Sequence, residues 1–342
     1  MLPFITSFLI CFILTPAVIR FASERRWFDK PDERKHHASE IPRLGGVAIM
    51  GSLIISILLV AGPETILNTR YFLAGLLILF FVGLWDDLQP ARPVIKLLGE
   101  FIPVILLTYF ARIPLAELFP QCAWISTLEW PFTIFMAFWA VNAYNLIDGI
   151  NGLAGTLGLI AMLGMGITGT PDVYHLCISM AGALLAFLFY NFLKPRIFMG
   201  DGGSLPVGYL LAFSLTQLNH TRLDIIPSMD RLSLPLTAFS LMSLPLFDMA
   251  RVFFIRLQMK KNPFKGDRNH LHHLLLENGL SHVGATIQLT LLSLLTAAIV
   301  LSTFTLNLDP LLASILALTV MALVPLIFTA FLWKKVKRNR NL

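Results

Sequence analysis

Residues 71–90 read YFLAGLLILFFVGLWDDLQP, an apolar run that ends in two adjacent carboxylates, Asp86 and Asp87. A helix that crosses the hydrocarbon core of a bilayer needs about 20 predominantly apolar residues. The stretch therefore predicts a transmembrane helix, near 70–85, with acidic side chains at one membrane face.

The same pattern recurs along the whole chain of 342 residues. It predicts an all-α, polytopic transmembrane bundle of about eleven spans, in a single membrane domain over 1–342. The expected spans lie near 2–20, 44–61, 70–85, 94–111, 130–147, 152–169, 173–191, 204–218, 233–251, 285–305 and 311–333. The longest hydrophilic stretches, including an expected cytoplasmic loop at 252–284, are too short for a soluble domain.

Composition supports a membrane setting. The chain is 56% apolar and 13% charged, with a mean hydropathy of +0.74, whereas soluble domains carry about 25% charged residues. The net charge of +6 does not require nucleic acid, because the basic residues lie in short loops between apolar runs. Cys11, Cys122 and Cys177 form no disulfide or metal pattern. The first apolar run has no basic residue before it, so we interpret it as a membrane helix rather than a cleaved signal.

The distribution of Lys and Arg predicts the orientation. One side carries 22 of the 26 basic residues, and the other carries only Arg70, Arg112, Arg222 and Arg231. Basic residues concentrate in cytoplasmic loops. The N-terminus is therefore expected in the periplasm and the C-terminus in the cytoplasm of a bacterial cytoplasmic membrane.

Polar residues gather on the predicted cytoplasmic face, at the inner ends of several spans. Each has an ordinary interpretation: a carboxylate at a helix end is usually a solvated terminus, and a histidine-rich loop can be incidental or a transition-metal site. Their recurrence on one face favours a functional site, because carboxylates and amides at membrane depth are costly. The residues concerned are Asp86, Asp87, Asn142, Asn145, Asp148, Asn151, Asp201, Asp248, Asp267, Arg268, His270, His272 and His273.

Carboxylate and amide oxygens without thiols suit Mg²⁺, with Mn²⁺ as a substitute, rather than zinc. A divalent cation near Arg, Lys and His side chains is suited to holding a diphosphate and stabilising charge in phosphoryl transfer. The residues alone therefore indicate a membrane enzyme that acts on a phosphorylated substrate at the cytoplasmic surface.

Six segments stand in order along the chain: KHHASEIPRLGG (35–46), GLWDDLQP (83–90), NAYNLIDGINGL (142–153), FMGDGGSLPVG (198–208), LPLFDMARV (244–252) and NPFKGDRNHLHHLL (262–275). Together they resemble the polyprenyl-phosphate N-acetylhexosamine-1-phosphate transferases, and DRNHLHH (267–273) is most similar to the bacterial undecaprenyl-phosphate GlcNAc-1-phosphate branch.

The resemblance implies a reaction that starts a lipid-linked cell-surface glycan. A UDP-N-acetylhexosamine would give its sugar-1-phosphate to undecaprenyl phosphate and release UMP. Direct attack and a two-step transfer both stay open, as do the sugar, the polymer (O-antigen or another polysaccharide) and the oligomeric state, a homodimer included.

The resemblance also implies site residues. Asp201 and Asn145 would hold Mg²⁺ across the diphosphate, and Asp86 and Asp87 would face the lipid phosphate as catalytic residues. Asp148 would lie near the uridine with a catalytic role as well. The expected substrate-binding residues are Asn142, Asp148, Arg268, His270, His272, His273, Lys35 and Arg43. Asn151 stands where relatives often carry Asp, so no role is assigned to it.

Two other classes are less well supported. A secondary transporter predicts polar residues at mid-span and internal repeats, whereas here the polar residues gather at one face. A prenyltransferase predicts two aspartate-rich clusters, whereas Asp86 and Asp87 form a lone pair.

Overall fold

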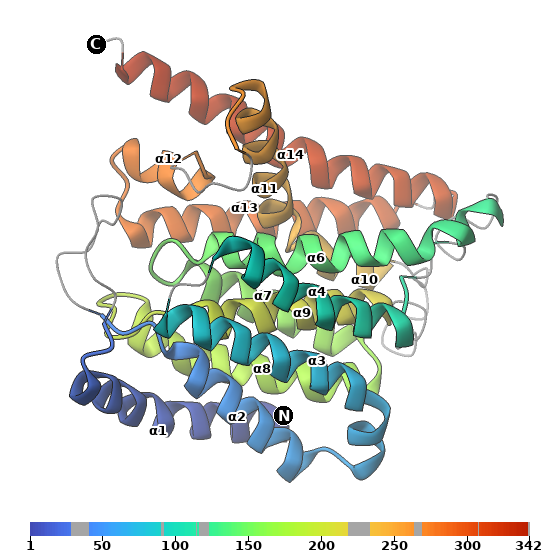
Figure 1. The fold of residues 1–342 in the computed structure, drawn as a ribbon. Helices are drawn as coiled ribbons and strands as arrows, with labels where there is room; N and C mark the ends of the chain where they lie inside the picture. The colour runs from blue at the N-terminus through green and yellow to red at the C-terminus, as the bar shows by residue number, and fades with distance from the viewer. Residues whose placement is uncertain are drawn as a thin grey trace. The chain divides into compact units, whose positions relative to one another are not determined.

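The computed structural model describes residues 1–28, 41–89, 92–113, 115, 123–217, 233–262, 269–306 and 308–340. Their contacts divide them into two compact units, one within Met1–Arg222 and one within Leu223–Leu342. The elements described are helical (Figure 1), as the sequence predicted. Lys35, Cys122, Arg222, Lys265 and Arg268 lie outside the described residues.

The first unit consists of helices that run alongside one another (Figure 1). They are α1 (Leu2–Arg25), α2 (Gly45–Val60), α3 (Pro63–Leu88), α4 (Pro93–Phe110), the 3₁₀ turn η1 (Ala123–Leu128), α6 (Glu129–Ile147), α7 (Leu153–Thr168), α8 (Pro171–Asn191) and α9 (Asp201–Thr216). Pro63, Pro93 and Pro171 stand in the first turns of their helices, where a missing N–H costs nothing and the fixed φ favours the helix.

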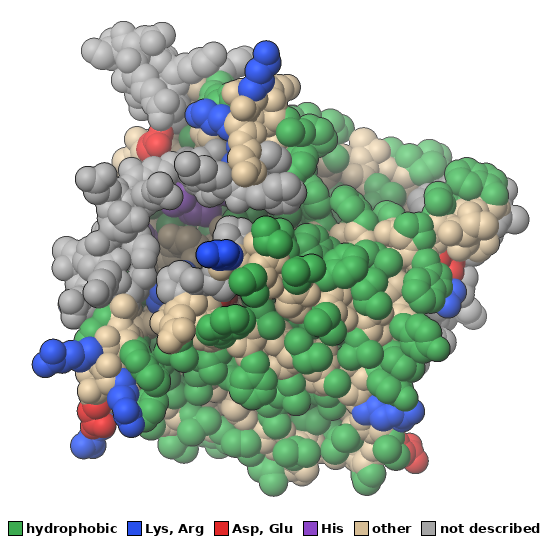
Figure 2. Space-filling model, in the orientation of Figure 1, with side chains coloured by type: hydrophobic (Ala, Val, Ile, Leu, Met, Phe, Trp, Pro, Cys, Tyr) green, Lys and Arg blue, Asp and Glu red, His purple; other side chains and the backbone are tan. Residues whose placement is uncertain are grey.

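Helix α9 forms the core of this unit. All 16 of its residues are buried, and it packs against α2, α3, α6, α7 and α8. The outer helices carry the apolar surface instead: Leu2, Ile5, Leu9 and Ile13 of α1 are exposed. Figure 2 shows hydrophobic side chains over most of the visible face of this unit. That surface suits contact with lipid.

The second unit contains α10 (Ser233–Ser240), α11 (Ser243–Gln258), α12 (Leu271–Glu277), α13 (His282–Phe304) and α14 (Pro310–Arg340). Helix α13 packs against α10 and α14, and the short α12 contacts both α13 and α14. Ser281 caps α13, because its hydroxyl accepts the backbone N–H of Gly284 at 3.1 Å.

Ten of the eleven predicted spans coincide with single helices, but the span predicted at 233–251 is wrong as a continuous helix. It is broken at Leu241 and Met242 into α10 and α11. Pro245 explains the break, because it has no N–H to donate to the carbonyl of residue 241. The loop expected at 252–284 also contains helical residues, since α11 continues to Gln258 and α12 lies within it.

Five of the described helices are long and apolar enough to cross a membrane, and two further apolar helices, Gly45–Val60 and Leu153–Thr168, are shorter. The five segments are Leu2–Arg25, Pro63–Leu88, Pro171–Asn191, His282–Phe304 and Leu312–Trp333. The chain is therefore a multi-pass membrane protein.

Candidate functional site

The start of α9 is fixed by a short stretch of backbone pairing. The N–H of Phe198 donates to the carbonyl of Pro42 at 2.8 Å, and Gly45 and Gly46 donate to the carbonyls of Phe198 and Met199 at 2.9 and 2.8 Å. Gly200 then adopts a φ of +69°, which glycine tolerates at no steric cost. This turn presents Asp201 as the first residue of α9.

Glycines in α2 and α3 allow these helices to touch the turn. A Cβ atom at Gly83 would lie 2.4 Å from the backbone carbon of Asp201, and one at Gly46 would lie 2.3 Å from that of Gly202. Neither space can hold a methyl group. Gly46 and Gly83 therefore allow α2 and α3 to pack closely against the first turn of α9.

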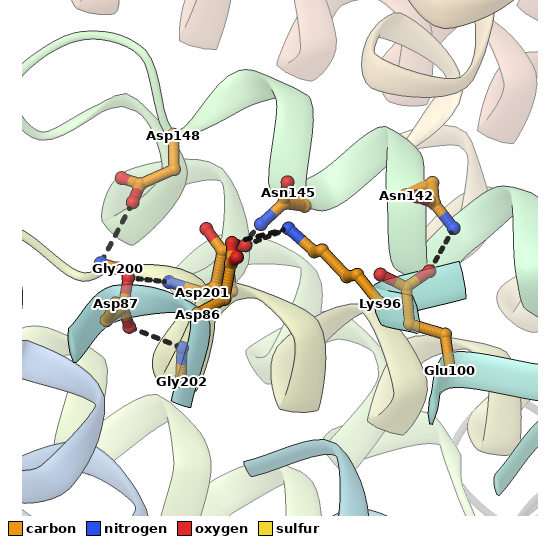
Figure 3. Close-up of polar contacts among 11 residues, drawn as sticks. Asp86, Asp87, Lys96, Glu100, Asn142, Asn145, Asp148, Gly200, Asp201 and Gly202 are labelled. Carbon is orange, nitrogen blue, oxygen red and sulfur yellow. Dashed lines mark hydrogen bonds and ion pairs between the residues drawn. The ribbon is translucent and has the colours of Figure 1, made fainter. Parts of the chain in front are cut away.

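Asp87, near the end of α3, binds the first turn of α9. Its Oδ1 accepts the backbone N–H of Asp201 at 2.9 Å, and its Oδ2 accepts that of Gly202 at 2.8 Å (Figure 3). These N–H groups have no partner inside the helix, and a carboxylate there also opposes the positive end of the helix dipole. Asp87, on the neighbouring helix α3, thus provides hydrogen-bond acceptors for the N–H groups at the start of α9.

Asp86 points to a different partner. Lys96 of α4 places its Nζ 3.3 Å from Oδ2 of Asp86 and also pairs with Oδ2 of Asp201 (Figure 3). The side chains of all three are largely buried. The two adjacent aspartates at the end of α3 therefore have different contacts. Asp87 holds the backbone at the start of α9, whereas Asp86 and Asp201 share the ammonium group of Lys96.

Two asparagines of α6 extend this cluster. Asn145 donates from Nδ2 to the hydroxyl of Ser204 at 2.8 Å. Asn142 donates to Oε2 of Glu100 at 2.8 Å. Glu100 is fully buried, and its Oε1 has no hydrogen-bond partner among the described residues. We refer to Asp86, Lys96, Asn145 and Asp201 as the acidic cluster.

Asp148 follows α6 and accepts the backbone N–H of Gly200 at 3.2 Å. Burial raises the pKa of Asp148 to about 8; Arg43 opposes this, and the charges of Asp201 and Asp87 add to it. The raised pKa therefore favours the protonated form of Asp148 at neutral pH. A cation or a basic group of a ligand would favour its ionised form.

The acidic cluster matches Mg²⁺ in ligand chemistry. Asp86 and Asp201 present hard carboxylate oxygens, and Asn145 can add an amide oxygen while its Nδ2 stays on Ser204. Among the described residues, no group of three or more His, Cys, Asp or Glu side chains forms a metal site. The third and further ligands would therefore be amide, substrate or water oxygens, as is usual for Mg²⁺.

The histidines lie in the second unit, where His270 contacts Asp248 of α11. His270 directs Nδ1 to Oδ2 of Asp248 at 2.9 Å, and the backbone N–H of Leu271 lies within 3.2 Å of both oxygens. Arg251 donates to Oδ1 from Nε at 3.1 Å and from Nη2 at 2.7 Å. The rings of His272 and His273 stand 4.2 Å apart.

His270 and His272 are buried, with exposed fractions of 4% and 2%. Histidines of an incidental surface loop would be exposed to solvent. Burial, followed by the neighbouring His273 and His270, lowers the pKa of His272 well below its ordinary value. The lowered pKa therefore favours the neutral form of His272 at neutral pH.

The structure brings together several of the predicted residues. Asp86, Asp87, Asn142, Asn145, Asp148 and Asp201 meet in the first unit, and Arg43 is close enough to affect the charge of Asp148. His270, His272 and His273 cluster in the second unit. Lys35 and Arg268 lie outside the described residues, and their role in substrate binding stays a prediction.

Sequence reasoning missed Lys96 and Glu100 as members of the site. Both lie in the span predicted at 94–111, four residues apart, which places them on one helix face. Charged residues inside a span are a functional signal. Lys96 and Arg251 were counted only among the basic residues that predict the orientation of the chain, and neither was assigned to the site.

Comparison with known proteins agrees with these motifs. The family model described as glycosyl transferase family 4 matches residues 69–219. A probable undecaprenyl-phosphate N-acetylglucosaminyl 1-phosphate transferase of Bacillus subtilis (strain 168) is 29% identical, over 98% of this chain and 97% of the relative. The undecaprenyl-phosphate alpha-N-acetylglucosaminyl 1-phosphate transferases of Escherichia coli (strain K12) and Salmonella typhi are 28% and 27% identical, over 79% of this chain and 75% of each relative. The predicted resemblance is confirmed.

Proposed function

Because the chain is related to glycosyl transferase family 4 and to undecaprenyl-phosphate N-acetylglucosaminyl 1-phosphate transferases, we propose that it transfers a sugar-1-phosphate to undecaprenyl phosphate. The donor is a UDP-N-acetylhexosamine, with UDP-GlcNAc as the first candidate, and the second product is UMP. The observation that carries the proposal is the convergence of Asp86, Asp201 and Lys96, supported by relatives with this activity in their names.

The reaction exchanges one phosphorus–oxygen bond for another. An oxygen of the lipid phosphate forms a bond to the phosphorus that carries the sugar, and the bond from that phosphorus to the oxygen of UMP breaks. Two anionic reactants must approach each other, so the site has to supply positive charge.

Lys96 supplies one such charge, and its contacts with Asp86 and Asp201 support a role at the acidic cluster. Its ammonium contacts the carboxylates of Asp86 and Asp201. A substrate phosphate beside the acidic cluster would offer Lys96 oxygens of higher negative charge. In this proposal Asp86 accepts hydrogen bonds near the lipid phosphate, and Asp87 keeps the first turn of α9 in position.

Asp201, with the amide oxygen of Asn145, is the proposed holder of Mg²⁺ or Mn²⁺. A bound divalent cation would neutralise the diphosphate of the donor and polarise the phosphorus under attack. Asp148 is proposed to lie near the uridine, and the histidines of the second unit near the phosphates.

The proposed topology has about eleven spans, the N-terminus in the periplasm and the acidic cluster at the cytoplasmic face. It rests on the 22 of 26 basic residues that fall on one side. This arrangement would give the site access to a soluble nucleotide and to a lipid whose phosphate lies at the interface.

The test is an assay of the full chain in detergent with undecaprenyl phosphate, Mg²⁺ and UDP-GlcNAc labelled in the sugar. The expected result is a labelled lipid together with an equal amount of UMP. UDP-sugars with other N-acetylated hexoses, run in parallel, identify the donor. Release of UDP instead of UMP, or an absence of lipid product with every donor, would exclude the proposed reaction.

A further inference from the structure

Glu100 of α4 is a buried carboxylate of which only one oxygen is paired. Its Oε2 accepts Nδ2 of Asn142 at 2.8 Å. Its Oε1 is buried as well and has no hydrogen-bond partner among the described residues. Buried polar atoms in folded proteins are almost always paired with protein, water or a ligand. The second oxygen therefore needs a donor, and a positively charged donor forms the strongest hydrogen bond with a carboxylate.

Lys96 is the donor best placed to pair with this oxygen. Residues four apart on a helix are neighbours on one face, with about 5–6 Å between their Cβ atoms. Figure 3 shows the oxygen of Glu100 that Asn142 does not contact on the side of Lys96, and the charges of Lys96 and Glu100 interact. Asn142 has no hydrogen left to offer, because its Nδ2 also donates to the carbonyl of Phe138 at 3.0 Å.

In the structure, however, the ammonium of Lys96 lies between carboxylates of two other helices. It contacts Oδ2 of Asp86 from α3 at 3.3 Å, and it pairs with Oδ2 of Asp201 from α9. Magnesium and manganese ions bind the same kind of oxygen atom. An ammonium and a divalent cation repel each other strongly at such short range. If Asp201 holds a divalent cation, the ammonium therefore has to leave these oxygens.

We infer that Lys96 and a divalent cation compete for the oxygens of Asp86 and Asp201, and that Glu100 is the positioning residue that accepts the ammonium when the cation binds. Without Glu100, the displaced ammonium would be a buried charge with no partner, which is strongly destabilising. The inference rests on the proposed function, because it takes Mg²⁺ or Mn²⁺ as the ligand of Asp201. It deepens that function by giving a role to Glu100.

The experiment measures binding of Mn²⁺ to the full chain in detergent, without nucleotide or lipid, from the electron paramagnetic resonance signal of the free ion. Asp201→Asn gives the background from other sites. Lys96→Met removes the competing ammonium, so the carboxylates are available throughout. We expect it to tighten Mn²⁺ binding by at least about tenfold, as for a site that is otherwise accessible less than a tenth of the time.

Lys194→Met is the matched control for this variant. Lys194 is an exposed residue just beyond α8, so the substitution removes the same charge from the surface. It should change the dissociation constant for Mn²⁺ by less than about twofold, because exposed charges are screened.

Glu100→Gln tests the positioning role. The amide keeps the size of the side chain and the acceptor for Asn142, but it lacks the charge that would hold the displaced ammonium. We expect Mn²⁺ binding to weaken by at least about fivefold, since Lys96 then stays longer on Asp86 and Asp201. Glu64→Gln is the control, because Glu64 is exposed in the first turn of α3, at the end far from Asp86.

The double variant Lys96→Met and Glu100→Gln separates positioning from simple attraction. Because Glu100 acts through Lys96, Glu100→Gln should weaken Mn²⁺ binding by less than about twofold once Lys96 is absent. A carboxylate that only attracted the cation by its charge would have the same effect in both backgrounds. Glu100→Met, which also removes the charge, takes the place of Glu100→Gln if that variant does not fold.

Three results would overturn the inference: no binding of Mn²⁺ above the Asp201→Asn background, equal binding by Lys96→Met and Lys194→Met, or an equal effect of Glu100→Gln with and without Lys96. Turnover with a UDP-sugar is measured separately. Competition for Mn²⁺ without transferase activity would refute the proposed function and leave this inference standing, whereas turnover without competition would do the reverse.

Discussion

The carboxylate of Asp87 accepts the backbone N–H of Gly202 at 2.8 Å, and this contact joins the end of α3 to the start of α9. Asp86, the next residue along the chain, turns to Lys96 instead. Two adjacent aspartates that look alike in the sequence therefore have separate structural partners.

Asp87→Ala should destabilise the protein more than Asp86→Ala. The first change leaves the N–H groups of Asp201 and Gly202 without partners, at a cost of about 1 to 3 kcal/mol. The second removes one carboxylate from a crowded acidic cluster and costs less. Thermal unfolding of both variants in detergent checks this order, and equal midpoints would show that Asp87 does not support α9.

Gly83→Ala should abolish transferase activity although glycine has no chemical group to offer. The added Cβ would lie 2.4 Å from the backbone of Asp201, so α3 and α9 would have to separate, and overpacking of this kind costs about 1 to 3 kcal/mol or more. Gly51→Ala, in α2, is the control, because its nearest neighbour is an ordinary 3.5 Å contact with Leu14. Full activity of Gly83→Ala would contradict the close approach.

Asp201→Asn should lose most of its turnover while the protein still inserts and folds. Lys96→Met should behave differently: without a divalent cation, Asp86 and Asp201 would face each other with no compensating charge. We expect Mg²⁺ to raise the unfolding temperature of Lys96→Met more than that of the unmodified chain. A tenth or more of normal turnover in Asp201→Asn at saturating Mg²⁺ would remove it as a proposed metal ligand.

Stability should fall as the pH is lowered below about 6.5, in part because of His272. Its pKa is held well below the ordinary value in the folded protein, so the unfolded chain binds a proton that the folded chain does not, and acid favours unfolding. The contribution is complete above the pKa of the unfolded chain, about 6.5. His272→Phe should flatten this dependence between pH 7 and 5, measured by chemical unfolding, and an unchanged slope would show that other groups cause it.

Cysteine labelling tests the orientation. In a background without native cysteines, Asn262→Cys should react with an impermeant reagent only after the cytoplasmic side is opened, and Arg112→Cys should react in intact cells. Asn262 is the second residue of the basic segment KNPFKGDR (261–268), whereas Arg112 is one of four basic residues on the other side. Labelling of Asn262→Cys from the periplasm would invert the proposed topology.

Much of the fold follows from apolar run length alone. The runs of α8 and α13 were placed within a few residues, whereas α3 begins at Pro63, well before the predicted start at 70. The break at Leu241 was missed because composition stays apolar across it, and only the missing N–H of Pro245 marks it. The close packing of Gly46 and Gly83 on α9 depends on which helices become neighbours, and no local pattern encodes that.

The sequence predicted which residues belong to the site, but it did not predict which groups those residues contact. Asp86, Asp201 and Asn145 were assigned to one site and do converge. The attachment of Asp87 to backbone N–H groups, and of Asp248 to Arg251 and His270, needed the three-dimensional structure, because each joins segments far apart in the chain. The roles first assigned to Asp87, Asp148 and the histidines remain predictions.

The complete burial of α9 bears on how this protein can change in evolution. A helix that faces lipid on one side can exchange one apolar residue for another there, and substitution tolerance then repeats with the helical period of 3.6 residues. Helix α9 has no such side, because every residue from Asp201 to Thr216 is enclosed. A saturation mutagenesis profile should therefore show α9 as a continuous block of intolerance and α1, with its exposed leucines and isoleucines, as a periodic one. In distant relatives that cannot be aligned elsewhere, α9 should therefore be the segment in which sequence similarity persists longest.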